Sequence, residues 1–156
     1  MTAQIAPAPA PAFRLLGYGG LLPFAAGAAL ALFGAPPWRD LAVPVLAAYG
    51  AVILSFLGAV HWGLALRATP GEAAAAWPRL GLGVLPALVG WVALLLPLRF
   101  GLALLAAAVM IVALVETAAA RRGLVPGSYL GLRWRLSVGA AACLLLGAYA
   151  AGSGGV

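Results

Sequence analysis

The sequence predicts an all-α membrane protein, a bundle of five transmembrane helices with its N-terminus in the cytoplasm and its C-terminus outside. Of the 156 residues, 65% are hydrophobic and 8% are charged, whereas about a quarter of the residues of a soluble domain are charged. One small core cannot hide this much apolar surface, so the solvent must be lipid. Five apolar runs are long enough to cross the hydrocarbon layer, at 14–34, 41–66, 80–97, 100–120 and 134–151.

The chain starts with an Ala/Pro-rich segment, residues 1–12, that has no hydrophobic periodicity. Proline removes backbone donors and nothing in this segment needs burial, so we expect a disordered tail. A single transmembrane domain then fills residues 13–156. Arg14 and the apolar run after it have the polarity of a signal peptide. The length of the run and the small basic segment favour a retained first span.

Short connections join the predicted spans. Residues 34–40 form a turn, and residues 97–101 form a tight hairpin between the third and fourth spans. Residues 69–77 predict a short surface helix, with Thr69 as its N-cap and Glu72 completing a capping box; a plain loop is the alternative. Prolines are expected to kink the first three spans, at Pro23, Pro44 and Pro86.

The arginines set the predicted orientation. The chain has nine basic residues and three acidic ones, a formal charge of +6. An N-terminus inside places seven arginines in inside segments: Arg14, Arg67, Arg79, Arg121, Arg122, Arg133 and Arg135. Only Arg39 and Arg99 then fall outside, as the positive-inside rule requires. The scattered arginines predict contact with anionic lipids at the cytoplasmic face, and the lack of a contiguous basic run disfavours nucleic-acid binding.

Three ionisable residues are predicted to share one depth in the membrane. His61, the only histidine, precedes Arg67 by about 9 Å along a helix, and Glu116 precedes Arg121 by about 8 Å. Arg133 opens the fifth span from the same side. A carboxylate inside hydrocarbon needs a partner, and Arg133 or His61 can supply one. A structural clamp is the favoured interpretation. A functional site, namely a proton relay, a lipid-headgroup pocket or a docking point, is the alternative.

Small residues repeat every fourth position along the second span. They are Ala47, Ala51, Ser55, Ala59 and Gly63. Such spacing makes a groove that lets another helix approach closely. We therefore expect this span to be the central helix of the bundle, or its groove to accept a helix of another protein.

The sequence contains no catalytic signature. It lacks GxSxG, P-loop, CxxC and HExxH patterns, so no catalytic residue is assigned and an enzyme is not expected. His61 and Cys143 lie far apart and do not make a metal site. Haem ligation by His61 lacks a second histidine, so no metal and no cofactor is expected.

Several segments together carry a family resemblance. They are Leu21–Phe24, Tyr49–Ala51, Ile53–Gly58, His61–Gly63 and Leu132–Arg133. Their most specific part is the SFLG-xxHWG core, with two residues beyond it: Ser55, Phe56, Leu57, Gly58, His61, Trp62, Gly63, Tyr129 and Arg133. The chain resembles a proteobacterial family of small multi-pass membrane proteins that share a domain of unknown function. That family is similar to eukaryotic transmembrane protein sixty-nine, a mitochondrial membrane protein.

The resemblance implies a bacterial inner-membrane location and no specific activity. The chain departs from the family pattern at two places. Glu116 stands where an aspartate is usual, and Ser128 precedes Tyr129 where a tryptophan is usual.

Our leading functional hypothesis is a non-enzymatic accessory or assembly partner of a larger inner-membrane complex. The small-residue groove and the absence of catalytic motifs favour it. The alternative is a small transporter or proton-conducting protein that uses His61, Glu116 and Arg133. The outer halves of the spans carry almost no polar side chains, which disfavours a continuous water path.

Overall fold

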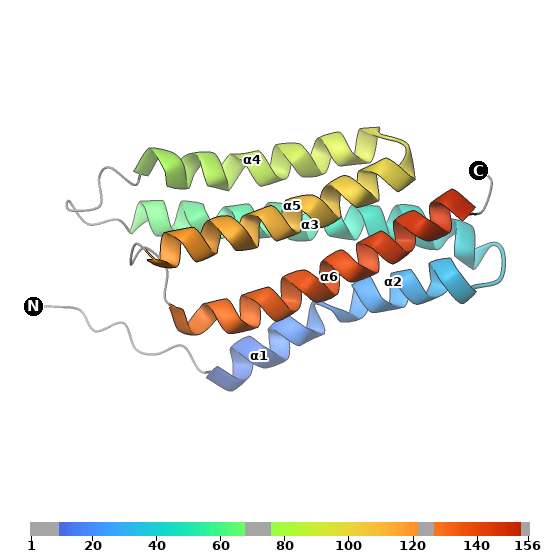
Figure 1. Ribbon diagram of the computed structural model, residues 1–156, viewed down its shortest axis with the longest axis horizontal. Helices are drawn as coiled ribbons and strands as arrows, with labels where there is room; N and C mark the ends of the chain where they lie inside the picture. The colour runs from blue at the N-terminus through green and yellow to red at the C-terminus, as the bar shows by residue number, and fades with distance from the viewer. Residues whose placement is uncertain (1–9, 68–75, 122–126, 154–156) are drawn as a thin grey trace, which may run out of the picture.

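The computed structural model describes residues 10–67, 76–121 and 127–153 of the chain. They form an elongated bundle of helices (Figure 1). The helices are α1 (Ala10–Gly19), α2 (Leu22–Phe33), α3 (Trp38–Leu66), α4 (Ala76–Leu95), α5 (Leu98–Arg121) and α6 (Gly127–Ser153). Five segments are long and apolar enough to cross a membrane, the first of them being α1 and α2 together (Pro11–Phe33). In the described part of the chain, the prediction of an all-helical protein with five segments able to span a membrane is confirmed.

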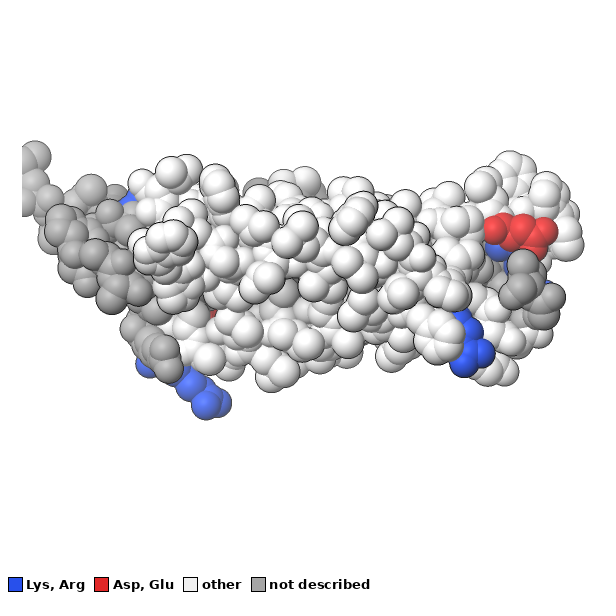
Figure 2. Space-filling model, turned by 90° about the horizontal axis from the view of Figure 1, so that it is seen from above, with Lys and Arg blue, Asp and Glu red and all other residues white. Residues whose placement is uncertain are grey.

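The two ends of the bundle differ in charge. The start of α1, the ends of α3 and α5, and the starts of α4 and α6 gather at one end (Figure 1). We call this the Arg-rich end, because six described arginines belong to these segments: Arg14, Arg67, Arg79, Arg121, Arg133 and Arg135. Arg39 and Arg99 lie at the opposite end, with Asp40. Figure 2 shows charged surface gathered at both ends, with almost none on the long stretch between them.

The helices extend beyond the predicted spans. The helix α1 starts at Ala10, so residues 10–12 of the predicted tail belong to it, and α4 starts at Ala76 instead of 80. The helix α6 starts at Gly127 instead of 134. Hydropathy marks only the hydrocarbon layer, whereas helical hydrogen bonding continues into the interface. The rest of the predicted tail, and the predicted surface helix up to residue 75, lie outside the described residues.

The first crossing is broken at Gly20 and Leu21, between α1 and α2. The amide of Leu21 donates to the carbonyl of Tyr18 at 3.0 Å, which closes the last turn of α1. Pro23 has no N–H to continue the ladder. The hydroxyl of Tyr49 in α3 donates to the Gly20 carbonyl at 3.0 Å. Pro44 and Pro86 lie inside α3 and α4, and both helices continue through them.

The helix α3 is the core of the bundle and contacts α2, α4, α5 and α6. Its most extensive contact is with α4, and glycines allow the two backbones to come close. A Cβ at Gly58 would lie 2.5 Å from the Gly83 carbonyl oxygen, and a Cβ at Gly90 would lie 3.3 Å from the Ala51 carbonyl oxygen. The expectation that the second span is the central helix is therefore confirmed.

Candidate functional site

A polar cluster lies inside the bundle near the Arg-rich end. It consists of His61 from α3, Glu116 from α5, and Arg133 and Ser137 from α6. Arg133 donates its Nε–H to Oε2 of Glu116 at 2.6 Å, and its NH1 group donates to Oγ of Ser137 at 2.8 Å. The first contact is a short charge-assisted hydrogen bond. It ties α5 to α6.

His61 faces the same carboxylate from α3. Its Nε2 atom lies 3.5 Å from Oε1 of Glu116, longer than the roughly 2.7–3.2 Å of a formed N–H···O hydrogen bond. His61 and Glu116 are 2% exposed and Arg133 is 3% exposed, so the cluster is enclosed by protein. Two of its buried nitrogens, Nε2 of His61 and NH2 of Arg133, have no hydrogen-bond partner among the described residues.

The structure thus brings together the three residues that the sequence placed at one depth. Each comes from a different helix, and each lies close to the Arg-rich end of that helix. Arg133 contacts Glu116 through Nε alone, whereas the sequence suggested a bidentate pair. The ordinary charge states are a carboxylate and a guanidinium, and these neutralise each other inside the bundle.

Other polar residues of the same interface had not been predicted from the sequence. Ser137 follows Arg133 by one helical turn and accepts from it. Next to the ion pair, Trp134 donates its indole N–H to Oγ1 of Thr117 at 2.9 Å, and Thr117 donates to the Ala113 carbonyl at 2.8 Å. In the sequence, Thr117 directly follows Glu116 and Trp134 directly follows Arg133. This adjacency was the signal from which the contact could have been predicted. These contacts extend the polar link between α5 and α6.

The SFLG-xxHWG core joins α3 to α4. Gly58 allows the close backbone approach at Gly83, and the ring of Trp62 lies where a side chain at Gly83 would be. The indole N–H of Trp62 donates to the Leu80 carbonyl at 3.3 Å. Leu57 is buried and Phe56 is exposed. The Tyr129 side chain lies outside the described residues.

The predicted small-residue face of α3 is divided between interior and surface. Ala47 and Ala51 are buried, Ser55 is half-buried and donates to the Ala51 carbonyl at 2.9 Å, and Ala59 and Gly63 are exposed. Residues four apart are offset by about 40° on a helix, so the stripe turns by about 160° from its first member to its last. The buried stripe instead alternates steps of three and four, through Ala47, Gly50, Leu54, Leu57 and His61. The predicted small-residue stripe therefore does not form a single groove along the whole of α3.

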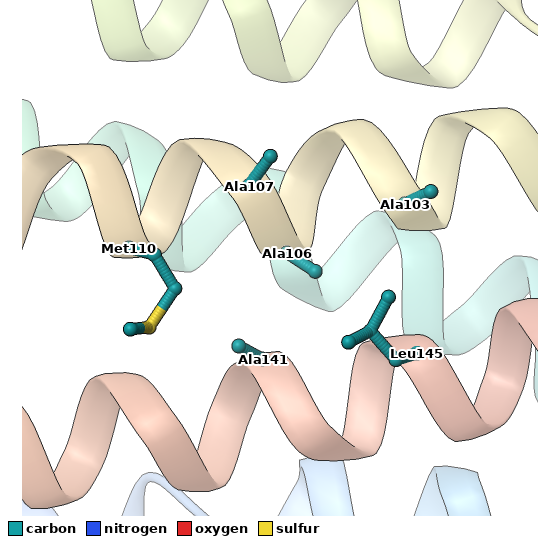
Figure 3. Close-up of a pocket in the computed structure, with 6 residues that line it drawn as sticks. All are labelled: Ala103, Ala106, Ala107, Met110, Ala141 and Leu145. Atoms are coloured by element: carbon teal, nitrogen blue, oxygen red, sulfur yellow. The ribbon is translucent and has the colours of Figure 1, made fainter.

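A concave surface lies between α5 and α6. It is an apolar groove of about 220 Å³, lined by Ala103, Ala106, Ala107, Met110, Ala141 and Leu145 (Figure 3). Met110 points from α5 toward α6, and small alanines leave the rest of the space open (Figure 3). The groove contains no polar group of the cluster. It is suited to apolar contact alone.

The described part of the chain offers few side chains that could bind a metal ion. No group of three His, Cys, Asp or Glu side chains there could hold a metal ion. Cys143 is half-buried in α6, with its thiol free. What the cluster can do is bind helices to one another and exchange hydrogen bonds among an imidazole, a carboxylate and a guanidinium.

These features define a class: a multi-pass membrane protein in which a buried polar cluster joins the described helices α3, α5 and α6. Residues 9–149 match the family described as "Protein of unknown function (DUF3429)", and the chain belongs to it. The chain is similar to Transmembrane protein 69 of Xenopus tropicalis, with 41% identity over 88 residues. That match covers 56% of this chain and 34% of the relative, so the chain corresponds to about a third of the relative's length. No solved structure matches the chain significantly.

Proposed function

We propose that this protein is a non-enzymatic accessory or assembly partner of a larger complex in the bacterial inner membrane. The observation that carries the proposal is the hydrogen bond of 2.6 Å between Arg133 and Glu116, deep inside the bundle. A carboxylate that moves ions or protons must exchange partners. Glu116 is instead held by a fixed opposite charge, and such a pair favours a rigid scaffold over a transport site.

The exposed half of the small-residue face is the partner surface in this proposal. Ala59 and Gly63 lie one turn apart at the surface of α3, and a Cβ at Gly63 would meet no atom within 4 Å. Small residues at this spacing allow another transmembrane helix to pack closely, which is how helices associate in lipid. We assign the occupant as a transmembrane helix of another membrane protein.

Co-purification from native membranes in mild detergent tests this surface. Ala59→Leu combined with Gly63→Leu should remove a stoichiometric partner, because leucine side chains hold the partner backbone away. Val52→Leu, at an exposed position of the same helix, is the matched control and should keep the partner. Ala51→Leu is a poor probe, because Ala51 is buried against Gly90 and its enlargement disturbs the bundle itself. A partner that stays bound to the double variant contradicts the proposed surface.

The orientation is part of the proposal. Six described arginines belong to the Arg-rich end and two to the opposite end, which supports a cytoplasmic Arg-rich end. Four of the six are exposed and can contact anionic lipids there: Arg14, Arg67, Arg121 and Arg135. The N-terminus is then inside and the C-terminus outside. Alkaline phosphatase fused after Val156 should be active, whereas green fluorescent protein fused there should be dark. The reverse pattern contradicts this orientation.

A small transporter or proton-conducting protein is the second candidate. The two unpartnered buried nitrogens, on His61 and Arg133, favour it because they leave hydrogen-bonding capacity free in the site. This candidate predicts a pH-driven flux in proteoliposomes that Glu116→Gln abolishes. An absence of flux in the unmodified protein under any imposed gradient contradicts it.

A further inference from the structure

The polar cluster has unused hydrogen-bonding capacity at one place. The Arg133 guanidinium uses Nε on Glu116 and NH1 on Ser137, which leaves NH2 without a partner in the described part of the chain. The His61 Nε2 atom is also unpartnered and lies 3.5 Å from Oε1 of the same carboxylate. A buried polar atom without a partner destabilises the folded protein. The two unpartnered nitrogens, Nε2 of His61 and NH2 of Arg133, therefore indicate that the cluster binds a ligand.

The chemistry of the cluster restricts what that ligand can be. Glu116 and Arg133 neutralise each other, so an additional anion or cation would bring an uncompensated charge into an enclosed site. Side chains that are only 2–3% exposed also leave no opening for a lipid headgroup. A small neutral molecule that both donates and accepts remains, and water is that molecule. Buried waters typically make about three hydrogen bonds to otherwise unsatisfied polar groups.

We propose that one water molecule is bound among His61, Glu116 and Arg133. It accepts from NH2 of Arg133 and makes its other hydrogen bonds with Nε2 of His61 and Oε1 of Glu116. Histidine is thereby joined to the carboxylate indirectly, and α3 becomes connected to α5 and α6 by hydrogen bonds. The inference does not depend on the proposed accessory function, since a scaffold and a transport site would both contain this water.

Solid-state NMR on the protein in deuterated lipid vesicles can detect the water directly. His61 is the only histidine of the chain, so labelling with ¹⁵N-histidine gives one pair of ring signals, provided that purification uses a tag without histidine. Polarisation started on water should reach Nε2 of His61 early. The ¹³C-methyl signal of Met110, which lines the apolar groove, should receive none on the same timescale. Absence of early transfer to His61 overturns the proposal.

Two substitutions separate a water bound by Arg133 from water that enters the bundle generally. Arg133→Lys keeps the charge but replaces three nitrogens by one, so the donor that NH2 supplies is removed and early transfer to His61 should be lost. Ser137→Ala removes only the partner of NH1, so the transfer should persist. Transfer that survives Arg133→Lys overturns the proposed site. If the lysine variant does not fold, the unmodified protein and Ser137→Ala still test the proposal. Absence of early polarisation transfer from water to Nε2 of His61 in either one contradicts the bound water.

Discussion

The indole ring of Trp62 in α3 occupies the space that a side chain at Gly83 in α4 would need. The same indole donates its N–H to the Leu80 carbonyl, one turn earlier in α4. Position 83 therefore has to be glycine for Trp62 to lie flat against α4. This relationship explains why a tryptophan directly follows the only histidine: it holds α4 beside the segment that carries the cluster.

Replacing this glycine should destabilise the protein. Gly83→Ala forces Trp62 away from α4, and overpacking of this kind costs about 1–3 kcal/mol of unfolding free energy. Gly81→Ala is the matched control in the same helix, because a Cβ there would meet no atom within 4 Å. The free energy of unfolding of each variant in detergent checks this expectation. Equal stability of the two variants would mean that the Trp62 contact contributes little.

The ion pair should show strong coupling between its two members. Arg133→Leu leaves the Glu116 carboxylate buried without its charged partner, a change that costs about 3–5 kcal/mol. Replacing both residues by leucine should cost less than Arg133→Leu alone, because no isolated charge remains in the bundle. A double-mutant cycle of unfolding free energies measures the coupling. Additive effects of the two single substitutions would contradict a direct buried pair.

One hydroxyl group stabilises the break in the first crossing. Tyr49→Phe removes the donor to the Gly20 carbonyl but keeps the ring, whose centroid lies 4.8 Å from that of Phe24. We expect a loss of about 1 kcal/mol and faster amide exchange at Gly20 and Leu21. Tyr149→Phe, at an exposed position of α6, should change neither quantity. Unaltered amide exchange at Gly20 and Leu21 in Tyr49→Phe would mean that the hydroxyl does not stabilise the break.

The contact between Trp134 and Thr117 should respond asymmetrically to substitution. Thr117→Val leaves the indole N–H of Trp134 without its acceptor, at a cost of about 1–3 kcal/mol. Thr117→Ser keeps the hydroxyl and should retain most of the stability. The indole N–H resonance of Trp134 should shift in the valine variant and stay in place in the serine variant. A shift of equal size in the serine variant, which keeps the hydroxyl, would mean that the resonance reports packing at position 117 and not the acceptor.

Hydropathy predicted the number of spans because lipid selects long apolar runs and little else has to be known. It also placed His61, Glu116 and Arg133 at one depth, since helical rise converts sequence distance into height. The starts of α4 and α6 could not be predicted in this way, because helices continue past the hydrocarbon into interfacial residues such as Trp77.

Rotation about the helix axis limited the prediction of the faces. Depth is fixed by counting residues, but neighbours depend on which side of each helix turns inward. The four-residue stripe from Ala47 to Gly63 leaves the interior halfway, because its period exceeds the helical period of about 3.6 residues. The contact of Trp134 with Thr117 likewise depends on the rotation of α6 relative to α5, which no single sequence reveals.

The helices that carry the cluster belong to three pieces of the described chain: α1 to α3, the pair α4 and α5, and α6. At the end opposite the cluster only Leu96 and Pro97 separate α4 from α5, so these two helices form a hairpin. The cluster takes His61 from the piece that ends with α3, Glu116 from this hairpin and Arg133 from α6. A piece that has not docked carries an unpaired polar group in lipid, where it is costly. Each of the three charged or titratable side chains therefore has its partners in the bundle only when α3, α5 and α6 are all in place, so the cluster makes the docking of these three helices interdependent.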